Sequence, residues 1–254
     1  MRCSGYAGAV TTHDHLAALP LYWINCESAP ERRREMEQHI APLFATERRL
    51  ESPEGFQSVS DADAMTFVRN WRSFWDVNRA MLTMANKPPG RDSPNLAVQK
   101  ANVAIRSAHL AALAAGVSDG HPRFMVAEDD LMVRQTLCDV SSPPVDADVA
   151  IWSGGLALAS VRSDDRSYAA GHAHRWLRVS DRACFNCLGA GMYEVTREAA
   201  ITLRDIAGGI PMSWDHAWGA AFQQMTVYRM APNALVQAGP SIRVNKIRTP
   251  VTVR

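Results

Sequence analysis

The sequence predicts an α/β fold in which a mostly parallel, twisted sheet is flanked by helices. Short apolar segments of strand length alternate with longer segments of helical spacing, an order typical of this class. A first apolar run leads directly into a capped helix, and a central run ends abruptly in three acids. With 254 residues, 47% apolar and 21% charged, the chain is long enough for one large domain with a buried core.

We expect this domain to span residues 19–240, because both ends of the chain differ in composition. Residues 1–18 mix Gly, Ala, Thr and His, which predicts a loose N-terminal arm. No Asp or Glu follows Asp215, so residues 241–254 form a basic tail. Such a tail suits a phosphate group or an anionic membrane surface, and a solvated end is the alternative. Its basic residues are Arg243, Lys246, Arg248 and Arg254.

Composition also limits the compartment and the partners. The formal charge is +1, and no strongly basic face interleaved with aromatic residues is evident, so we expect no nucleic-acid partner. The first 25 residues lack the pattern of a secretory signal, and no stretch reaches the roughly 20 apolar residues of a membrane span. The cysteines are odd in number and dispersed, which fits a reducing, cytoplasmic setting. They are Cys3, Cys26, Cys138, Cys184 and Cys187.

The central feature is the acidic end of an apolar run. Phe124–Ala127 predicts a short buried strand, introduced by the turn residues Asp119–Pro122, and Glu128, Asp129 and Asp130 follow it directly. In an open α/β sheet, ligands bind outside the carboxyl ends of the strands. The acids therefore occupy a position suited to a ligand.

Side chains alternate along a strand, so Glu128 and Asp130 are predicted on one face and Asp129 on the other. Two converging carboxylates suit a hard cation, Mg²⁺ or Mn²⁺, that carries a diphosphate. A solvated loop or a helix N-cap is the alternative interpretation of the three acids.

The N-terminal half begins with a predicted strand at Leu19–Asn25. Ser28 and Glu31 then form a capping box, with Ser28 as N-cap and Pro30 in the first turn. The helix is predicted to continue to Ile40. A strand, a tight turn and a helix N-terminus bearing arginines make a plausible nucleotide-binding corner.

Further elements follow in order along the chain. Ala45–Leu50 predicts a second strand, and Asp61–Met84 predicts a helix. A polar loop at Lys87–Pro94 precedes a helix expected over Asn95–Val117. The predicted helix at Asp61–Met84 carries an aromatic stripe that we expect to face the core, consisting of Phe67, Trp71, Phe74 and Trp75. The polar stretch Arg162–His174 lacks a period and is suited to a mobile lid.

Five segments contain motifs that matter in combination. They are Trp23–Arg33 (WINCESAPERR), Ser107–Leu110 (SAHL), Ala127–Asp130 (AEDD), Asp148–Gly155 (DVAIWSGG) and Gly189–Ala200 (GAGMYEVTREAA). In this order they resemble glycosyltransferase family 25, the lipooligosaccharide and collagen galactosyltransferase group. The chain departs from the family pattern at three positions. The family usually has Leu where this chain has Cys26, commonly has Arg where it has Ser28, and has Ser where it has Ala108.

The resemblance implies a GT-A fold and a set of donor contacts. The residues that it places near the nucleotide sugar are Asn25, Arg32, Arg33, His109, Glu128 and Asp129. For the two arginines, a solvated helix face is an equally open interpretation. For His109, the alternative is a packed, hydrogen-bonded core residue.

The resemblance also gives the remaining acids a chemical role. Asp130, helped by Glu128, would hold Mn²⁺ or Mg²⁺ against the leaving diphosphate. Pro211–His216 (PMSWDH) resembles the family's P-V-D step, and Asp215 is the candidate base for the acceptor hydroxyl. Trp214 would supply an aromatic wall for a sugar ring. The alternative is that Asp215 caps a helix starting near His216.

The sequence therefore predicts a metal-dependent glycosyltransferase, of the kind used in lipopolysaccharide biosynthesis. It would move a sugar from a nucleotide-diphosphate donor, such as a UDP-sugar, to a glycan or lipid-linked acceptor, with inversion. A non-catalytic nucleotide- or glycan-binding module on the same fold is the main alternative. A metal-dependent phosphoesterase or nuclease is a third reading, with less support from the residue pattern.

Overall fold

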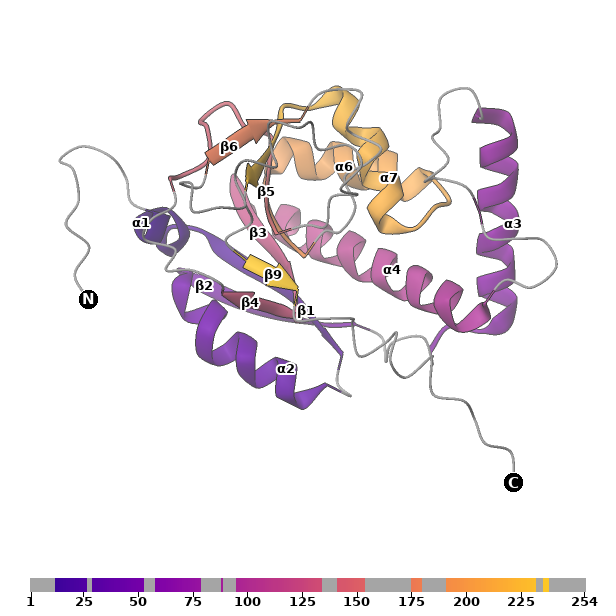
Figure 1. Ribbon diagram of the computed structural model, residues 1–254, viewed down its shortest axis with the longest axis horizontal. Coiled ribbons are helices and arrows are strands. Elements are labelled where there is room, and N and C mark those ends of the chain that lie inside the picture. Colours follow the sequence, from indigo (N-terminus) through magenta and orange to yellow (C-terminus); the bar gives the residue numbers. More distant parts are fainter. Residues whose placement is uncertain are drawn as a thin grey trace.

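The computed structural model describes residues 12–26, 29–52, 58–78, 88, 95–133, 141–153, 175–179, 191–231 and 235–237. These residues form an α/β structure with a seven-stranded sheet in the order β2-β1-β3-β7-β5-β8-β6 (Figure 1). The strands are β1 (Pro20–Cys26), β2 (Thr46–Ser52), β3 (Arg123–Glu128), β5 (Val149–Ser153), β6 (Arg175–Arg178), β7 (Met192–Thr196) and β8 (Val227–Ala231).

The sheet is mixed and mostly parallel. Strands β1, β2, β3, β5 and β8 run in one direction, and β7 and β6 run in the other. A second, two-stranded sheet pairs β4 (Leu131–Val133) with β9 (Leu235–Gln237). The predicted α/β class and mostly parallel sheet are therefore confirmed.

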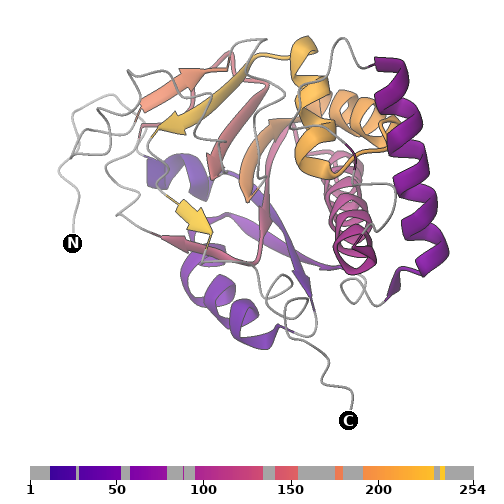
Figure 2. The ribbon, with the colours of Figure 1, turned by 45° about the vertical axis from the view of Figure 1, so that its right-hand side comes forward.

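Helices cover both faces of the main sheet (Figure 2). They are α1 (Thr12–Ala17), α2 (Pro30–Glu35), α3 (Asp61–Asn78), α4 (Leu96–Ser118), α6 (Arg197–Gly209) and α7 (Trp214–Ala221). After α2 the chain continues as a π-helical segment, Met36–Ile40, and a short 3₁₀ turn, Ala41–Leu43. Among the described helices, none is both long and apolar enough to span a bilayer.

The central strands divide the core into two layers. Leu21 and Trp23 of β1 pack in one cluster with Met36 and Ile40, which follow α2. The alternate side chains of the same strand belong to the opposite cluster, with residues of α3, α4, α6 and α7. Strand β3 divides in the same way. Helices α2 and α4 therefore lie on opposite faces of the sheet.

The local predictions agree with the structure in most elements. Asn95 caps α4 by accepting a hydrogen bond from the Val98 N–H, and Gly120 has φ +78°, as the turn before β3 requires. The aromatic stripe of α3 faces the core as predicted, with Phe67, Trp71 and Trp75 buried.

The start of α2 differs from the prediction. The N-cap position belongs to Ala29, which makes no side-chain capping bond, because the helix begins at Pro30. Proline fixes φ for the first helical residue and lacks an N–H to be capped, so it sets the start here. Ser28 was therefore the wrong residue for the N-cap, and its own placement lies outside the described residues.

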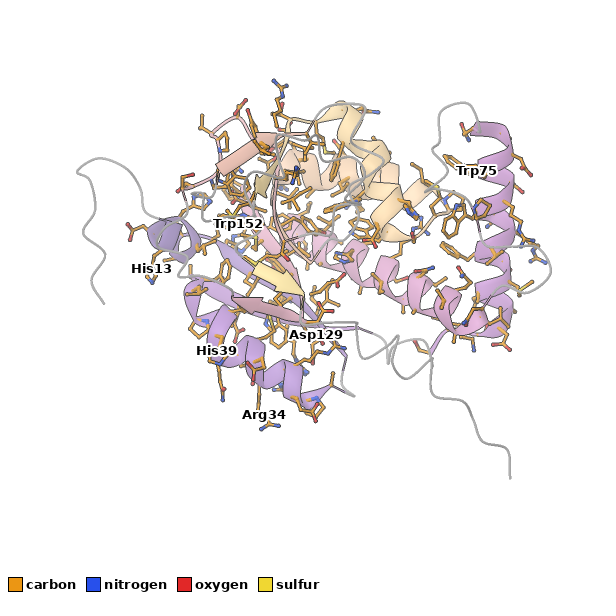
Figure 3. All side chains as sticks on the ribbon, viewed as in Figure 1. His13, Arg34, His39, Trp75, Asp129 and Trp152 are labelled. Atoms are coloured by element: carbon orange, nitrogen blue, oxygen red, sulfur yellow. The ribbon has the colours of Figure 1, made fainter. Side chains whose placement is uncertain are left out.

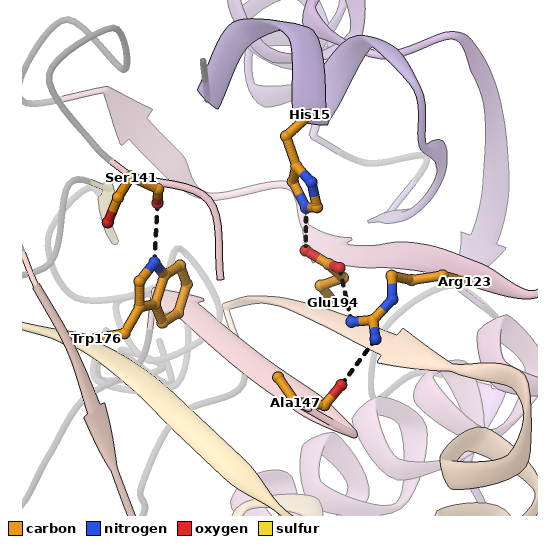
Figure 4. A network of polar contacts seen from close by, with 6 residues as sticks. All are labelled: His15, Arg123, Ser141, Ala147, Trp176 and Glu194. Carbon is orange, nitrogen blue, oxygen red and sulfur yellow. Dashed lines mark hydrogen bonds and ion pairs between the residues drawn. The ribbon is translucent and has the colours of Figure 1, made fainter. Parts of the chain in front are cut away.

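The expectation of a loose arm over residues 1–18 is wrong for its second half. Residues Thr12–Ala17 form α1, and Leu16 is fully buried. The His15 imidazole lies 2.8 Å from Glu194 Oε2, and Arg123 Nη1 donates to Glu194 Oε1 over 2.9 Å (Figure 4). Arg123 also donates to the Ala147 carbonyl at 2.8 Å. Glu194 is completely buried, and its contact with His15 connects α1 to the sheet.

Several predicted segments lie outside the described residues. They are residues 1–11, most of the Lys87–Pro94 loop, the candidate lid Arg162–His174, and the basic tail 241–254.

The contact between α4 and β3 yields a stability prediction. A Cβ at Gly116 would lie 2.5 Å from two ring atoms of Phe124, which is fully buried. Gly116→Ala should therefore lower the free energy of unfolding by about 1–3 kcal/mol, although alanine normally favours a helix. Chemical denaturation measures this. Gly209→Ala is the control, because nothing lies within 4 Å of its Cβ position. Equal stability of the two variants would contradict the close packing.

Candidate functional site

The candidate site lies where the chain reverses its direction of progress across the sheet. From β1 the chain passes through α2 to β2 on one side, and then through α3 and α4 to β3 on the other. Strands β1 and β3 are parallel neighbours, so their carboxyl ends meet at one edge. Asn25 lies near the end of β1, and Glu128 ends β3. In sheets of this type, such a switch point is the usual place for a ligand.

The three acids separate at this edge. Glu128 turns to the α4 side, where its Oε1 lies 3.0 Å from His109 Nε2. Asp129 turns to the α2 side, as alternation predicts, and bonds Arg32. Asp130 was predicted to share the face of Glu128, and this was wrong, since its Oδ2 lies 3.7 Å from Arg32 Nη1. The alternation ends because β3 stops at Glu128 and the chain enters β4.

On the α2 side, Asp129 is held at both carboxylate oxygens. Its Oδ2 accepts from Asn25 Nδ2 at 2.7 Å, and its Oδ1 accepts from Arg32 Nη1 at 2.7 Å. Arg49 of β2 donates to Asn25 Oδ1 at 3.3 Å. Asn25 and Asp129 are 1% and 3% exposed, so this is a buried polar network (Figure 3, Asp129). Its geometry assigns Asp129 to orienting Arg32 and Asn25.

The two predicted donor arginines have different surroundings. The Arg32 side chain is 12% exposed and reaches both aspartates. Arg33 is 47% exposed and donates to Glu37, one turn later on α2. For Arg32, the solvated-face alternative is excluded. For Arg33, this alternative fits the structure. Consecutive helical residues point about 100° apart, so Arg33 lies toward solvent when Arg32 points to the aspartates.

On the α4 side, a buried histidine supports Glu128. His109 is fully buried; its Nδ1 lies 3.2 Å from the Tyr193 hydroxyl, and its Nε2 faces Glu128. Its ring stacks on Trp214 at a centroid distance of 4.9 Å and an angle of 4°. Burial raises the pKa of Tyr193 well above its usual value, and the charge of Glu128 adds to this. Tyr193 therefore keeps its proton.

His109 thus lies behind Glu128 and does not face open space. A neutral His109 satisfies both contacts when it accepts from Tyr193 at Nδ1 and donates from Nε2 to Glu128. The alternative that His109 is a packed, hydrogen-bonded core residue therefore fits the structure. His109 can affect a ligand only through the Glu128 carboxylate, which is 21% exposed.

Asp215 lies in the first turn of α7 and is partly exposed. The helix begins at Trp214 with Ser213 as N-cap, so the alternative that Asp215 caps the helix is wrong. Trp214 is 1% exposed and stacked on His109, so the predicted aromatic wall for a sugar is also wrong. Its indole face is already used in packing, which spacing along the chain does not reveal.

The donor set can be tested for a fit to Mg²⁺ or Mn²⁺. Within the described part of the chain, no group of three His, Cys, Asp or Glu side chains converges as a ready-made metal site. Mg²⁺, however, is usually bound by one or two carboxylates together with substrate phosphates. Asp129 is committed to Asn25 and Arg32, so Asp130 fits this role best, with Glu128 across the edge as the second carboxylate.

A scan against protein-family models finds none that matches the chain, and a search of curated proteins finds no significant match. The function is therefore inferred from the geometry of the site and the resemblance of its motifs.

Sequence reasoning missed two residues of the network. Arg49 lies in β2 beside β1, and Tyr193 lies in β7 next to β3. Arg49 meets Asn25 through the pairing of β1 with β2, whereas Tyr193 meets His109 where α4 packs on the sheet. The only signal in the sequence was a polar residue within a predicted strand or motif.

The Asp129–Arg32 ion pair generates a stability prediction. Asp129→Asn leaves a nearly buried guanidinium with a weaker partner, so we expect a loss of about 3 kcal/mol in the free energy of unfolding. Glu37→Gln removes the exposed pair with Arg33 and should cost less than about 1 kcal/mol. Urea denaturation compares the two. A loss in Asp129→Asn no larger than in the control would show that the ion pair is not structural.

Proposed function

We propose that this protein is a sugar-nucleotide glycosyltransferase with a GT-A-type fold, related to family 25. It would transfer a sugar from a nucleotide-diphosphate donor to a glycan or lipid-linked acceptor. The observation that carries this proposal is the convergence of Asn25, Arg32, Asp129 and Asp130 at the switch point between β1 and β3. The order of the five motifs along the chain supports the same conclusion.

The charges at this edge suit a diphosphate. Arg32 is a nearly buried guanidinium, which is a good donor to phosphate oxygens, and Asp129 fixes its position. Asp130 and Glu128 would hold Mg²⁺ or Mn²⁺, which would offset the charge that develops on the leaving diphosphate. The structure thus provides side chains for both signs of charge.

The reaction would be a single displacement. The acceptor hydroxyl oxygen forms a bond to the anomeric carbon while the bond from that carbon to the diphosphate oxygen breaks. A carboxylate takes the hydroxyl proton, and attack opposite the leaving group inverts the anomeric centre. Asp215, in the first turn of α7 on the α4 side, is our candidate for this base. His109, which is itself hydrogen-bonded to Tyr193, would hold Glu128 in place.

The test combines binding with turnover. Thermal unfolding is measured with UDP, GDP and CDP, each with Mn²⁺ and with EDTA, because a ligand that binds the native state raises the melting temperature. Sugar nucleotides that contain the nucleoside diphosphate with the largest stabilisation are then assayed for release of that nucleoside diphosphate. Binding without turnover on any acceptor would favour the non-catalytic module. No stabilisation by any nucleotide would overturn the proposal.

For the cation, we expect Asp130→Ala to abolish Mn²⁺-dependent nucleotide binding while the protein stays folded. A carboxylate at a strand end serves the ion, and its loss removes the most suitable ligand. Isothermal calorimetry with UDP and Mn²⁺ measures this. Asp205→Ala, which removes an exposed carboxylate of α6, is the matched control. Unchanged affinity in Asp130→Ala would remove Asp130 from the site.

For the base, Asp215→Asn should lower the transfer rate on the order of 10²–10⁴-fold with donor binding unchanged. Ser213 holds the N-cap position, so this nearly isosteric change removes no helix cap. Steady-state transfer assays and donor titration together give the result. A variant that transfers at close to the parental rate would exclude Asp215 as the base.

A further inference from the structure

Arg32 places a positive charge beside Asp130, where a bound cation would also place one. Its Nη1 lies 2.7 Å from Asp129 Oδ1 and 3.7 Å from Asp130 Oδ2. The three side chains are 12%, 2% and 7% exposed, so water screens them only weakly. The guanidinium therefore already offsets part of the negative charge of both aspartates.

A divalent cation on Asp130 would share this carboxylate with the guanidinium. Like charges at such short range repel, and the repulsion is stronger in a partly desolvated site than in water. Arg32, Asp129 and Asp130 together carry a net charge of −1, Arg49 beside Asn25 brings this to zero, and Glu128 on the α4 side returns it to −1. A cation alone therefore meets only one net negative charge. A diphosphate adds the negative charge that both cations require.

Arg32 Nε is buried and has no hydrogen-bond partner among the residues that the structure describes. A buried N–H without an acceptor costs free energy, and an anion that reaches it would recover this cost. Arg32 therefore has a donor to offer to a phosphate oxygen while Asp129 continues to hold its Nη1.

We propose that Arg32 competes with the divalent cation for Asp130, so that the cation binds well only together with the diphosphate of the donor. This inference rests on the proposed function, because it assigns the coupling between two ligands of the same site. Asp129 anchors the guanidinium in both states. The protein would then avoid holding a cation in the absence of its nucleotide.

The experiment measures Mn²⁺ binding without nucleotide, from the electron paramagnetic resonance signal of free Mn²⁺. Arg32→Gln should bind Mn²⁺ about tenfold more tightly than the wild type, because a competing positive charge is removed. The same variant should bind UDP or GDP more weakly. Arg34→Gln is the matched control, since it removes the same charge from an exposed position on the same helix, and it should leave Mn²⁺ affinity unchanged (Figure 3, Arg34).

Linkage provides a second measurement on the unaltered protein. In the wild type, the nucleoside diphosphate should raise Mn²⁺ affinity by about tenfold or more, and Mn²⁺ should raise nucleotide affinity by the same factor. This coupling factor should fall in Arg32→Gln. Arg32→Lys keeps a point charge but loses the planar fork, so its gain in Mn²⁺ affinity should be smaller than that of the glutamine variant. Arg32→Met, which is also neutral and of similar length, is the deciding variant if Arg32→Gln does not fold.

The outcomes separate this inference from the proposed function. A folded Arg32→Gln, or in its place the equally neutral Arg32→Met, that binds Mn²⁺ no more tightly than the wild type would overturn the competition. A wild type that binds no nucleoside diphosphate, with or without Mn²⁺, would overturn the proposed function. The comparison of Mn²⁺ affinities would still report on Arg32 in that case.

Discussion

The parallel pairing of β1 with β3 places Asn25 and the three acids at one edge, because strands that run in the same direction present their carboxyl ends together. Helix α2 on one face and α4 on the other then bring Arg32 and His109 to that edge from opposite sides. The contacts of Asp129 with Asn25 and Arg32, and of Glu128 with His109, depend on this arrangement. A shift in the β1–β3 register would separate Asn25 from Asp129 and leave a buried carboxylate poorly partnered.

The two sides of the edge are built differently. The α2 side carries opposite charges in contact, with Asp129 between an amide and a guanidinium. On the α4 side, the Glu128 carboxylate is supported by His109 within an aromatic stack. Removing one partner of a buried ion pair leaves an uncompensated charge. The Asp129–Arg32 pair should therefore stay in contact unless another charged group binds beside it. The α4 side holds its carboxylate through packing.

A buried charge also determines how the beginning of the described chain joins the fold. Glu194 lies in the middle of β7 without exposure, and it receives His15 from α1 and Arg123 from β3. A carboxylate in this position requires partners, and α1 supplies one of them from 179 residues away. Helix α1 is therefore part of the domain, and its six residues depend on this contact and on Leu16 for their place.

Local spacing along the chain was enough to predict the central strand at Phe124–Ala127, the helix over Asn95–Val117 and the aromatic stripe of α3. Periodicity acts over a few residues, so it is readable without a structure, whereas the N-cap of α2 was not predicted correctly. Which side chains meet depends on the tertiary structure. Asn25 and Asp129 are 104 residues apart, and the face of Asp130 is set by the departure of the chain into β4, whose partner strand comes a hundred residues later. Contacts of this kind arise from strand pairing and layer packing, which leave no periodic mark in the sequence.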